Sequence, residues 1–244
     1  MLGVNEQKRT VINYTQDITS VSFQTNPRVT DTTIIDSAQH QNLSTISYTT
    51  FTLPSGASCS LPSDVYQYQA DTINVLRRSH TIYNLDATYV NQHIIGLPET
   101  QLVCDGSQGA VPCTVDSGTS LVSRIKLQYD ENSIQNQGAI TQHDETNYGA
   151  SFLAGRGNPT SVRRYDVFNM SNSTISSVQY NTAGSPVTAT DALEHQSSIS
   201  YADSFSADGN NVANPSVTTL AYPTAVSVSD PNPITSYIRY NHVT

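Results

Sequence analysis

The 244-residue sequence contains no tryptophan, and charged residues make up only 13% of it. Lys and Arg number 11 against 20 Asp and Glu, so the formal net charge is -9. Binding to nucleic acid depends on clustered basic side chains that neutralise phosphates, and this composition therefore argues against a specific nucleic-acid partner. The lack of tryptophan also counts against a sugar-stacking surface, although tyrosine can take that role.

Long apolar runs are missing as well. No stretch approaches the roughly 20 residues that a membrane-spanning helix needs, and the N-terminus has no charged-then-apolar leader. We therefore expect neither a membrane span nor a signal peptide. The three cysteines are Cys59, Cys104 and Cys113. A disulfide could close the turn-rich span between Cys104 and Cys113, and reduced thiols fit the sequence equally well.

Strand-forming residues are abundant in what remains. The chain has 14 Tyr and 5 Phe beside many Val, Ile and Thr, while the apolar fraction is only 36%. Such a chain can build a thin core between sheets whose outer faces are polar. Short strand-like segments recur at roughly 10-residue spacing with Gly and Pro between them, which predicts an all-β fold, either an antiparallel β-sandwich or a barrel.

The clearest strand is expected over residues 120–129, where apolar and polar side chains alternate. This alternation predicts that Leu121, Ile125 and Leu127 face the core together. A helix is considered only over 64–76, where Val65, Tyr68, Ile73 and Leu76 approach helical spacing behind a possible Ser63 or Asp64 cap. Further strands are expected at 43–53, 82–90, 225–228 and 234–240, with one or two more within 162–178.

The domain organisation follows from segments without apolar periodicity. Residues 1–30 are polar with short apolar pulses such as Val11-Ile12, and we expect them to form an extended N-terminal arm. Residues 31–244 are expected to form a single β-sandwich domain. The Ser-, Ala-, Thr- and Asp-rich stretch at 180–214 is expected to be a long loop or insertion within it. No internal repeat is apparent in the sequence.

One motif is chemically suggestive. Val115-Asp116-Ser117-Gly118-Thr119 resembles the second catalytic motif of pepsin-like aspartic proteases, in which two Asp residues share one proton. No second motif of this kind occurs, so we interpret Asp116 as part of a turn before a strand. His143-Asp144-Glu145 could contribute to a cation site, and a solvated loop is the interpretation we favour. We expect no catalytic residues, no metal site and no cofactor.

Two segments resemble the jelly-roll capsid proteins of icosahedral viruses. One is the strand-like stretch from Asn42 that ends at Pro54-Ser55-Gly56, behind a polar arm, and the other is the turn-bounded stretch Ser120 to Leu127. In the lineage with large double-jelly-roll capsid proteins, a similar Ser-Leu-x-x-Arg-Ile/Val strand precedes a polar, Tyr- and Asn-containing segment, here Asp144 to Tyr148. The likeness covers about a third of the chain, and the length suits a single jelly roll.

This resemblance implies a jelly-roll sandwich with long loops and a structural function in the virion. The partners would be copies of the chain and other capsid proteins, and the chain would form a homo-oligomer, a trimer or a pentamer. The alternative from a different class is a carbohydrate-binding or adhesive β-sandwich module. A third hypothesis, an aspartic protease acting through Asp116, ranks well below both.

Overall fold

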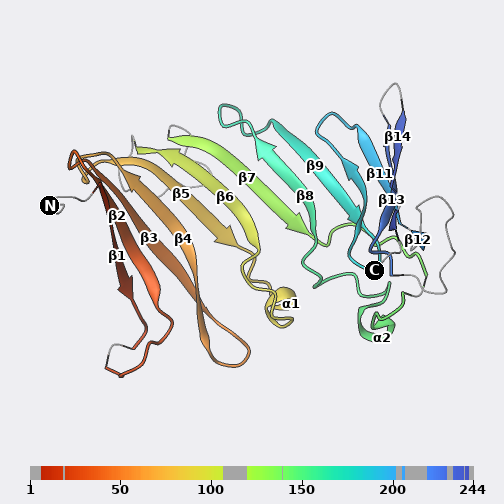
Figure 1. Ribbon diagram of the computed structural model, residues 1–244, viewed down its shortest axis with the longest axis horizontal. Coiled ribbons are helices and arrows are strands. Elements are labelled where there is room, and N and C mark those ends of the chain that lie inside the picture. Colours follow the sequence, from red (N-terminus) through yellow and green to blue (C-terminus); the bar gives the residue numbers. More distant parts are fainter. Residues whose placement is uncertain are drawn as a thin grey trace. The chain divides into compact units, whose positions relative to one another are not determined.

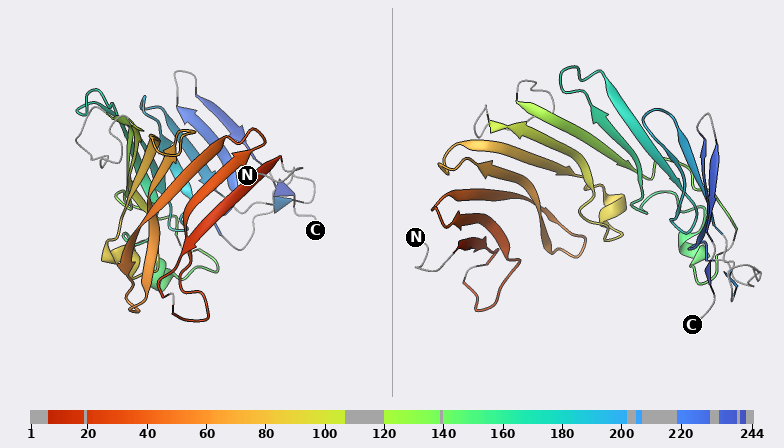
Figure 2. Two further views of the ribbon diagram at one scale, coloured as in Figure 1. Left: turned by 90° about the vertical axis from the view of Figure 1, so that its left-hand side faces the viewer. Right: turned by 45° about the horizontal axis from the view of Figure 1, so that its top comes forward.

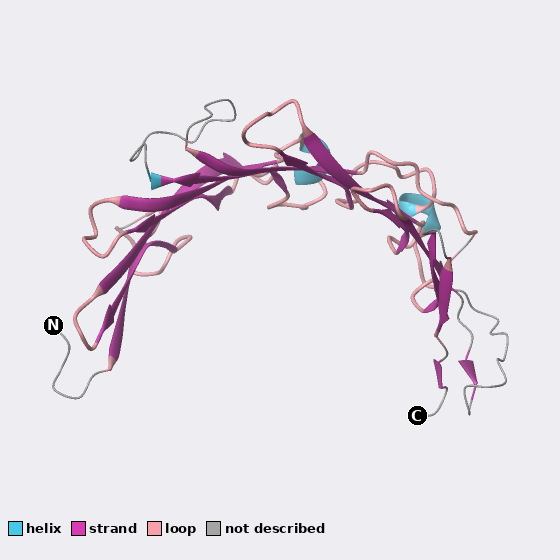
Figure 3. Ribbon diagram, turned by 90° about the horizontal axis from the view of Figure 1, so that it is seen from above, coloured by secondary structure: helices cyan, strands magenta, loops and turns pink. Residues whose placement is uncertain are grey.

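A computed structural model of the chain describes residues 7–18, 20–106, 120–138, 140–201, 205–206, 219–229, 233–238 and 240–241. Strands hold 54% of the residues and helices 5%, so the protein is all-β, as the sequence predicts. The helices are α1 (Ala87–Val90) and α2 (Glu145–Tyr148), drawn in cyan in Figure 3. In the part of the chain that the structure describes, no helix has the length and apolar character that crossing a membrane requires.

Thirteen strands form one antiparallel sheet, in which β1 and β14 are the two edge strands (Figure 1). The first seven are β1 (Lys8–Thr15), β2 (Arg28–Asp36), β3 (Gln41–Thr52), β4 (Ser58–Tyr68), β5 (Val75–Tyr83), β6 (Pro98–Asp105) and β7 (Leu121–Tyr129). The next six are β8 (Pro159–Tyr165), β9 (Ser173–Tyr180), β10 (Pro186–Thr190), β11 (Gln196–Tyr201), β13 (Pro223–Ser229) and β14 (Ile234–Tyr237). The short strands β12 (Phe205–Ser206) and β15 (Tyr240–Asn241) pair separately.

Strand order follows the sequence, because each strand of the sheet pairs with the next one along the chain. A jelly roll would instead need two packed sheets with Greek-key crossings. The all-β, antiparallel part of the prediction is thus confirmed, and the jelly-roll sandwich is not. Local turns account for the order, since most neighbouring strands are joined by short connections that leave no room for a crossing.

The chain divides into two compact units, one of residues 1–126 with 164–173 and the other of residues 127–163 with 174–244. Within the first unit, β1 belongs to the segment expected as an arm, and it pairs with β2 over its whole length. Within the second, β10 and β11 form a hairpin inside the segment expected as a long loop. The single domain over 31–244 stays a prediction.

Two local predictions are wrong. The window 64–76 is no helix: it holds the end of β4, the hairpin turn and the start of β5. In the turn the Asp71 carboxylate accepts the backbone N–H groups of Ile73 and Asn74. The Tyr, Thr and Val content of this window favours strands, and this preference outweighs the helical spacing. The window 82–90 is a strand only to Tyr83, after which the Asp86 side chain caps α1 by accepting the Thr88 N–H.

The strands expected at 43–53, 120–129, 162–178, 225–228 and 234–240 correspond to β3, β7, β8 with β9, β13 and β14. In β7 the expected face assignment fails. Leu121 lies opposite Cys104 and Ser123 opposite Val103, so Val122 is an extra residue in the ladder. This bulge places Leu121 on the face of Leu102 and Cys104, whereas Ile125 lies opposite Gln101 on the other face.

The buried core of the first unit is small. Leu102, Cys104 and Leu121 form its centre, and Val167 and Met170 from the β8–β9 turn pack against them. Leu102 is the most enclosed apolar side chain, with 1% of its surface exposed. Most strand residues are only half-buried, so the sheet must draw much of its stability from contacts between neighbouring strands.

A recurring hydrogen bond provides such a contact. In five hairpins of the described chain, a tyrosine hydroxyl in or just after the second strand donates to a backbone carbonyl of the first strand. We call it the Tyr–carbonyl bond. The pairs are Tyr48 to Val29 (2.9 Å), Tyr83 to Pro62 (2.8 Å), Tyr180 to Pro159 (3.0 Å), Tyr201 to Pro186 (2.8 Å) and Tyr240 to Pro223 (2.9 Å).

The same tyrosines mark the junction to the next hairpin. Tyr48 lies opposite Pro62, Tyr83 opposite Pro98 and Tyr201 opposite Pro223, in each case beside a shift in register. Pro98 and Pro223 are the first residues of their strands, where a missing N–H breaks no ladder bond, whereas Pro62 lies inside β4 at the register shift. The sheet is therefore built from structurally repeated hairpins, although no repeat is apparent in the sequence.

Candidate functional site

The Asp116 motif lies outside the described residues, so its role as a turn or as a catalytic group stays a prediction. Cys113 lies outside them as well. Cys104 is disulfide-bonded and Cys59 carries a free thiol, which favours the disulfide over the reduced alternative for Cys104.

The structure places His143, Asp144 and Glu145 in and before α2, where the chain itself occupies their side chains. Asp144 caps the helix by accepting the N–H groups of Thr146 and Asn147. Its pKa lies below the ordinary value, first because of the hydrogen bond from the Asn147 side chain. A Glu145 carboxylate oxygen accepts the Ile140 N–H and contacts His143 Nδ1 at 3.0 Å. No group of three or more potential metal ligands gathers within the described ranges.

A charge cluster that sequence reasoning missed lies on β4 and β5. Asp64 is directly opposite His80 in the strand register, and Arg78, opposite Tyr66, is two pairs away on the same face. Asp64 Oδ1 accepts a hydrogen bond from Arg78 Nε at 2.8 Å and contacts His80 Nδ1 at 2.7 Å, while Ser63 donates to Oδ2 at 3.1 Å. The Arg78 guanidinium also lies 5.2 Å from the Tyr66 ring centre. Strand alternation in 64–66 and 78–80 could have indicated that these side chains share a face.

The electrostatics of this cluster are those of a satisfied ion network. Burial by itself would raise the pKa of Asp64, but the hydrogen bonds from His80 and Arg78 outweigh it and hold the pKa below the ordinary value. The side chains of Arg78 and Asp64 are 8% and 13% exposed. The cluster joins two strands through desolvated charge pairs, and we assign it a structural role.

The free edge of β1 is the most conspicuous surface of the first unit. Figure 2 shows β1, at the red end of the colour scale, beside β2, and no other strand of the described chain pairs with it. Its large side chains are exposed on both faces: Val11 by 39%, Ile12 by 44% and Tyr14 by 63%. An edge of this kind presents unpaired backbone N–H and C=O groups to any strand that can reach it. The adjacent apolar residues Val11 and Ile12, in an otherwise polar segment, were the sequence signal for this strand.

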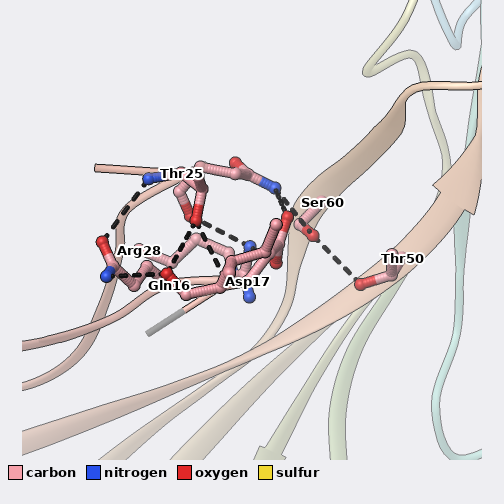
Figure 4. A network of polar contacts seen from close by, with 8 residues as sticks. Gln16, Asp17, Thr25, Arg28, Thr50 and Ser60 are labelled. Carbon is pink, nitrogen blue, oxygen red and sulfur yellow. Dashed lines mark hydrogen bonds and ion pairs between the residues drawn. The ribbon is translucent and has the colours of Figure 1, made fainter. Parts of the chain in front are cut away.

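The connection from β1 to β2 is held by a polar network, shown in Figure 4. Asp17 forms an ion pair with Arg28. The hydrogen bond that the Arg28 guanidinium donates in this pair is the main reason why the pKa of Asp17 lies below its ordinary value. Asn26 donates to Asp17 Oδ2 at 3.1 Å, and the Thr25 hydroxyl accepts the Ile18 N–H at 2.9 Å. These bonds fix the loop against the strand ends.

A pocket opens beside this loop, at the end of β1. It has a volume of about 620 Å³ and is lined by Tyr14, Thr15, Gln16, Gln24 and Pro27. One aromatic ring, two amides and a hydroxyl are the groups with which proteins hold neutral polar ligands. The Tyr14 hydroxyl has no hydrogen-bond partner among the described residues. Pocket and β1 edge together form the candidate site.

In the second unit, β14 is the other edge strand. Ile234 and Tyr237 on it are 67% and 78% exposed. It has four residues against eight in β1, so it offers fewer backbone groups for pairing.

Comparisons with known proteins identify no family. No protein-family model matches the sequence, and no curated protein matches it. Among solved structures, one match is a chain of the complex described as "Crystal Structure of TcdB2-TccC3-Cdc42", with 9% sequence identity and a TM-score of 0.36. The alignment covers 84% of this chain and only 8% of that one. A similarity of this size supports no conclusion about fold or function.

Proposed function

We propose that the protein is a structural subunit that works by self-association, as a capsid protein in a virion shell. The observation that carries the self-association is the β1 edge, where unpaired backbone groups coincide with exposed Val11, Ile12 and Tyr14. Proteins normally protect such an edge with charges, proline or a covering element. In β1 the charges, Lys8 and Arg9, stand only at the beginning, and residues 10–15 are uncharged. An edge with this uncharged stretch suits a chain that adds a strand from a neighbour.

The virion part of the proposal comes from the sequence resemblance to jelly-roll capsid proteins. The sequential strand order is not that of a jelly roll, so the proposal is supported by the open edge rather than by the fold. The trimer or pentamer and the virion location belong to the same proposal.

Sedimentation velocity of the purified chain over a wide concentration range tests it, with electron microscopy of any large species. We expect oligomers or particles, and weaker association after deletion of residues 1–26, which removes β1. Ile12→Lys should weaken association too, because it places a charge on the edge strand. Ile73→Lys is the matched control, since Ile73 is also exposed but lies in the β4–β5 turn. A full-length chain that stays monomeric at every concentration contradicts the proposal.

The pocket beside β1 supports a second candidate, a carbohydrate-binding or adhesive module. Tyr14 would stack against a sugar ring while Gln16 and Gln24 bond its hydroxyls. Screening the protein on a glycan array tests this function. Binding that is lost in Tyr14→Ala and kept in Tyr237→Ala would favour the module over the shell subunit.

A further inference from the structure

The edge strand β1 has the features of the second strand of a hairpin. Tyr14 lies opposite Val29, the first-strand residue whose carbonyl accepts the Tyr48 hydroxyl, and a register shift separates Asn13 from Tyr14. Tyr48 and Tyr83 occupy the same position relative to the strand that follows them. β1 is thus half of a repeat whose first strand is missing from the described chain.

The hydroxyl of Tyr14 shows what is missing. The five tyrosines that make the Tyr–carbonyl bond are half-buried, whereas Tyr14 is 63% exposed and its hydroxyl has no partner in the described residues. In the repeated hairpins, the acceptor comes from an antiparallel strand on the side of the tyrosine strand that is free in β1. An antiparallel strand at this edge would complete the unit.

We propose that the missing strand is β1 of a second copy, so that two chains join their sheets through antiparallel β1–β1 pairing about a two-fold axis. This inference rests on the proposed function and specifies one of its contacts. A two-fold axis makes any strand that pairs with its own copy antiparallel. β1 has eight residues and β14 has four, so β1 offers more backbone groups for pairing between two copies. Icosahedral shells contain two-fold axes as well as three- and five-fold axes, so such a contact fits the proposed shell.

The repeated hairpins fix the register. The β10–β11 pairing of Thr188 with Ser198, when extended, places Tyr201 opposite Ser185, one residue before the acceptor Pro186. The β13–β14 pairing places Tyr240 in the same way opposite Tyr222, one residue before Pro223.

The same offset in the β1–β1 pair puts Tyr14 opposite Lys8 of the second copy. The Tyr14 hydroxyl then donates to the Arg9 carbonyl, and Val11 lies opposite Val11 on the axis. Lys8 faces the Tyr14 ring, where a cation is favourable, and no like charges lie opposite each other.

Disulfide trapping tests the register. Directly opposed residues in an antiparallel pair have Cβ atoms about 5 Å apart, close enough for a disulfide after small adjustment. In a Cys59→Ser background, which removes the free thiol, Val11→Cys should form covalent dimers under mild oxidation at micromolar concentration. Ile73→Cys is the control, because it is exposed in a turn away from the edge, and it should stay uncrosslinked.

Two further variants measure the pairing by the dimer dissociation constant from sedimentation. Tyr14→Phe removes two symmetry-related hydrogen bonds from the dimer, each worth about fivefold, so it should raise the dissociation constant about 25-fold. Tyr237→Phe on β14 should leave it unchanged. Val11→Lys should also raise it, because it opposes two like charges on the axis.

If the chain self-associates but Val11→Cys does not crosslink, or if Tyr14→Phe and Val11→Lys leave the association unchanged, the β1–β1 contact is wrong while the proposed function stands. If the chain is monomeric at every concentration, both are overturned.

Discussion

The β4–β5 hairpin and the β1 edge each carry a tyrosine at the same position, but only the tyrosine of the hairpin has a hydrogen-bond partner in the described chain. In the hairpin, the Tyr83 hydroxyl is bonded to the Pro62 carbonyl at 2.8 Å, and the Asp64 cluster joins the two strands. At the edge, Tyr14 lies at the equivalent position with an exposed side chain, and its hydroxyl has no partner among the described residues. The hairpin is closed by its own first strand, and β1 has none within the described chain.

This difference teaches how the sheet is stabilised. Its buried core is small, so each hairpin depends on local bonds that fix its two strands together. Where those bonds are complete, removal of a partner should cost folding stability. Where they are incomplete, as at β1, the same substitution should leave the folding of the single chain unaffected and change only what binds there.

The largest expected difference between interior and edge comes from the core. Leu102→Ala should lower the free energy of unfolding by about 2–5 kcal/mol, because it leaves a cavity among Cys104, Leu121, Val167 and Met170. Val11→Ala at the edge should have little effect on the monomer, since Val11 is already exposed. Chemical denaturation followed by circular dichroism measures both. Equal losses would show that the edge is as well packed as the core.

The charge cluster should give the next largest effect. Arg78→Ala leaves the desolvated Asp64 with only the Ser63 hydroxyl and His80 as partners in the cluster, and breaking a buried pair in this way costs about 3 kcal/mol. The pKa of Asp64 is lowered in the folded state, so its contribution is present above the ordinary carboxyl pKa and is lost as the pH falls through the lowered value. Asp64→Asn should therefore reduce the acid sensitivity of the unfolding free energy between about pH 5 and pH 2. An unchanged pH profile would assign the acid sensitivity to other carboxylates.

A smaller effect distinguishes the two tyrosines directly. Tyr83→Phe removes one hydrogen bond to the Pro62 carbonyl and should cost about 1 kcal/mol of unfolding free energy. Tyr14→Phe, measured at a concentration where the chain is monomeric, should cost nothing, because its hydroxyl has no partner within the described chain. A comparable loss in both variants would remove the distinction between closed and open hairpins.

The smallest effect concerns two hairpin turns that share one geometry. Asp36 accepts the N–H groups of Ala38 and His40 and contacts the His40 ring, and Asp191 does the same with Leu193 and His195. Asp36→Ala and Asp191→Ala should lower the melting temperature slightly and by similar amounts. Differential scanning calorimetry can compare them, and a large effect of one alone would show that the two turns are not equivalent parts of a repeat.

The sequence by itself determined the all-β class and several strands, because alternation and β-branched or aromatic content act within a few residues. This is why 43–53 and 120–129 were predicted as strands and observed as β3 and β7. The same local signals misled at 64–76, where a helical spacing of apolar residues coincided with a hairpin whose turn is made by Asp71.

Only the tertiary structure decided the rest. The bulge at Val122 depends on the partner strand β6, so the alternation within β7 could not show that Leu121 and Ile125 face opposite sides. The repeat was hidden because the interval between acceptor and tyrosine varies from 15 residues (Pro186 to Tyr201) to 21 (Pro62 to Tyr83), while the hydrogen bond depends on the pairing of the strands. The pairing of strands also decides which of them lie at an edge. The apolar residues of β1 were recognised in the sequence, but its place as an edge strand follows only from the strand order of the whole sheet.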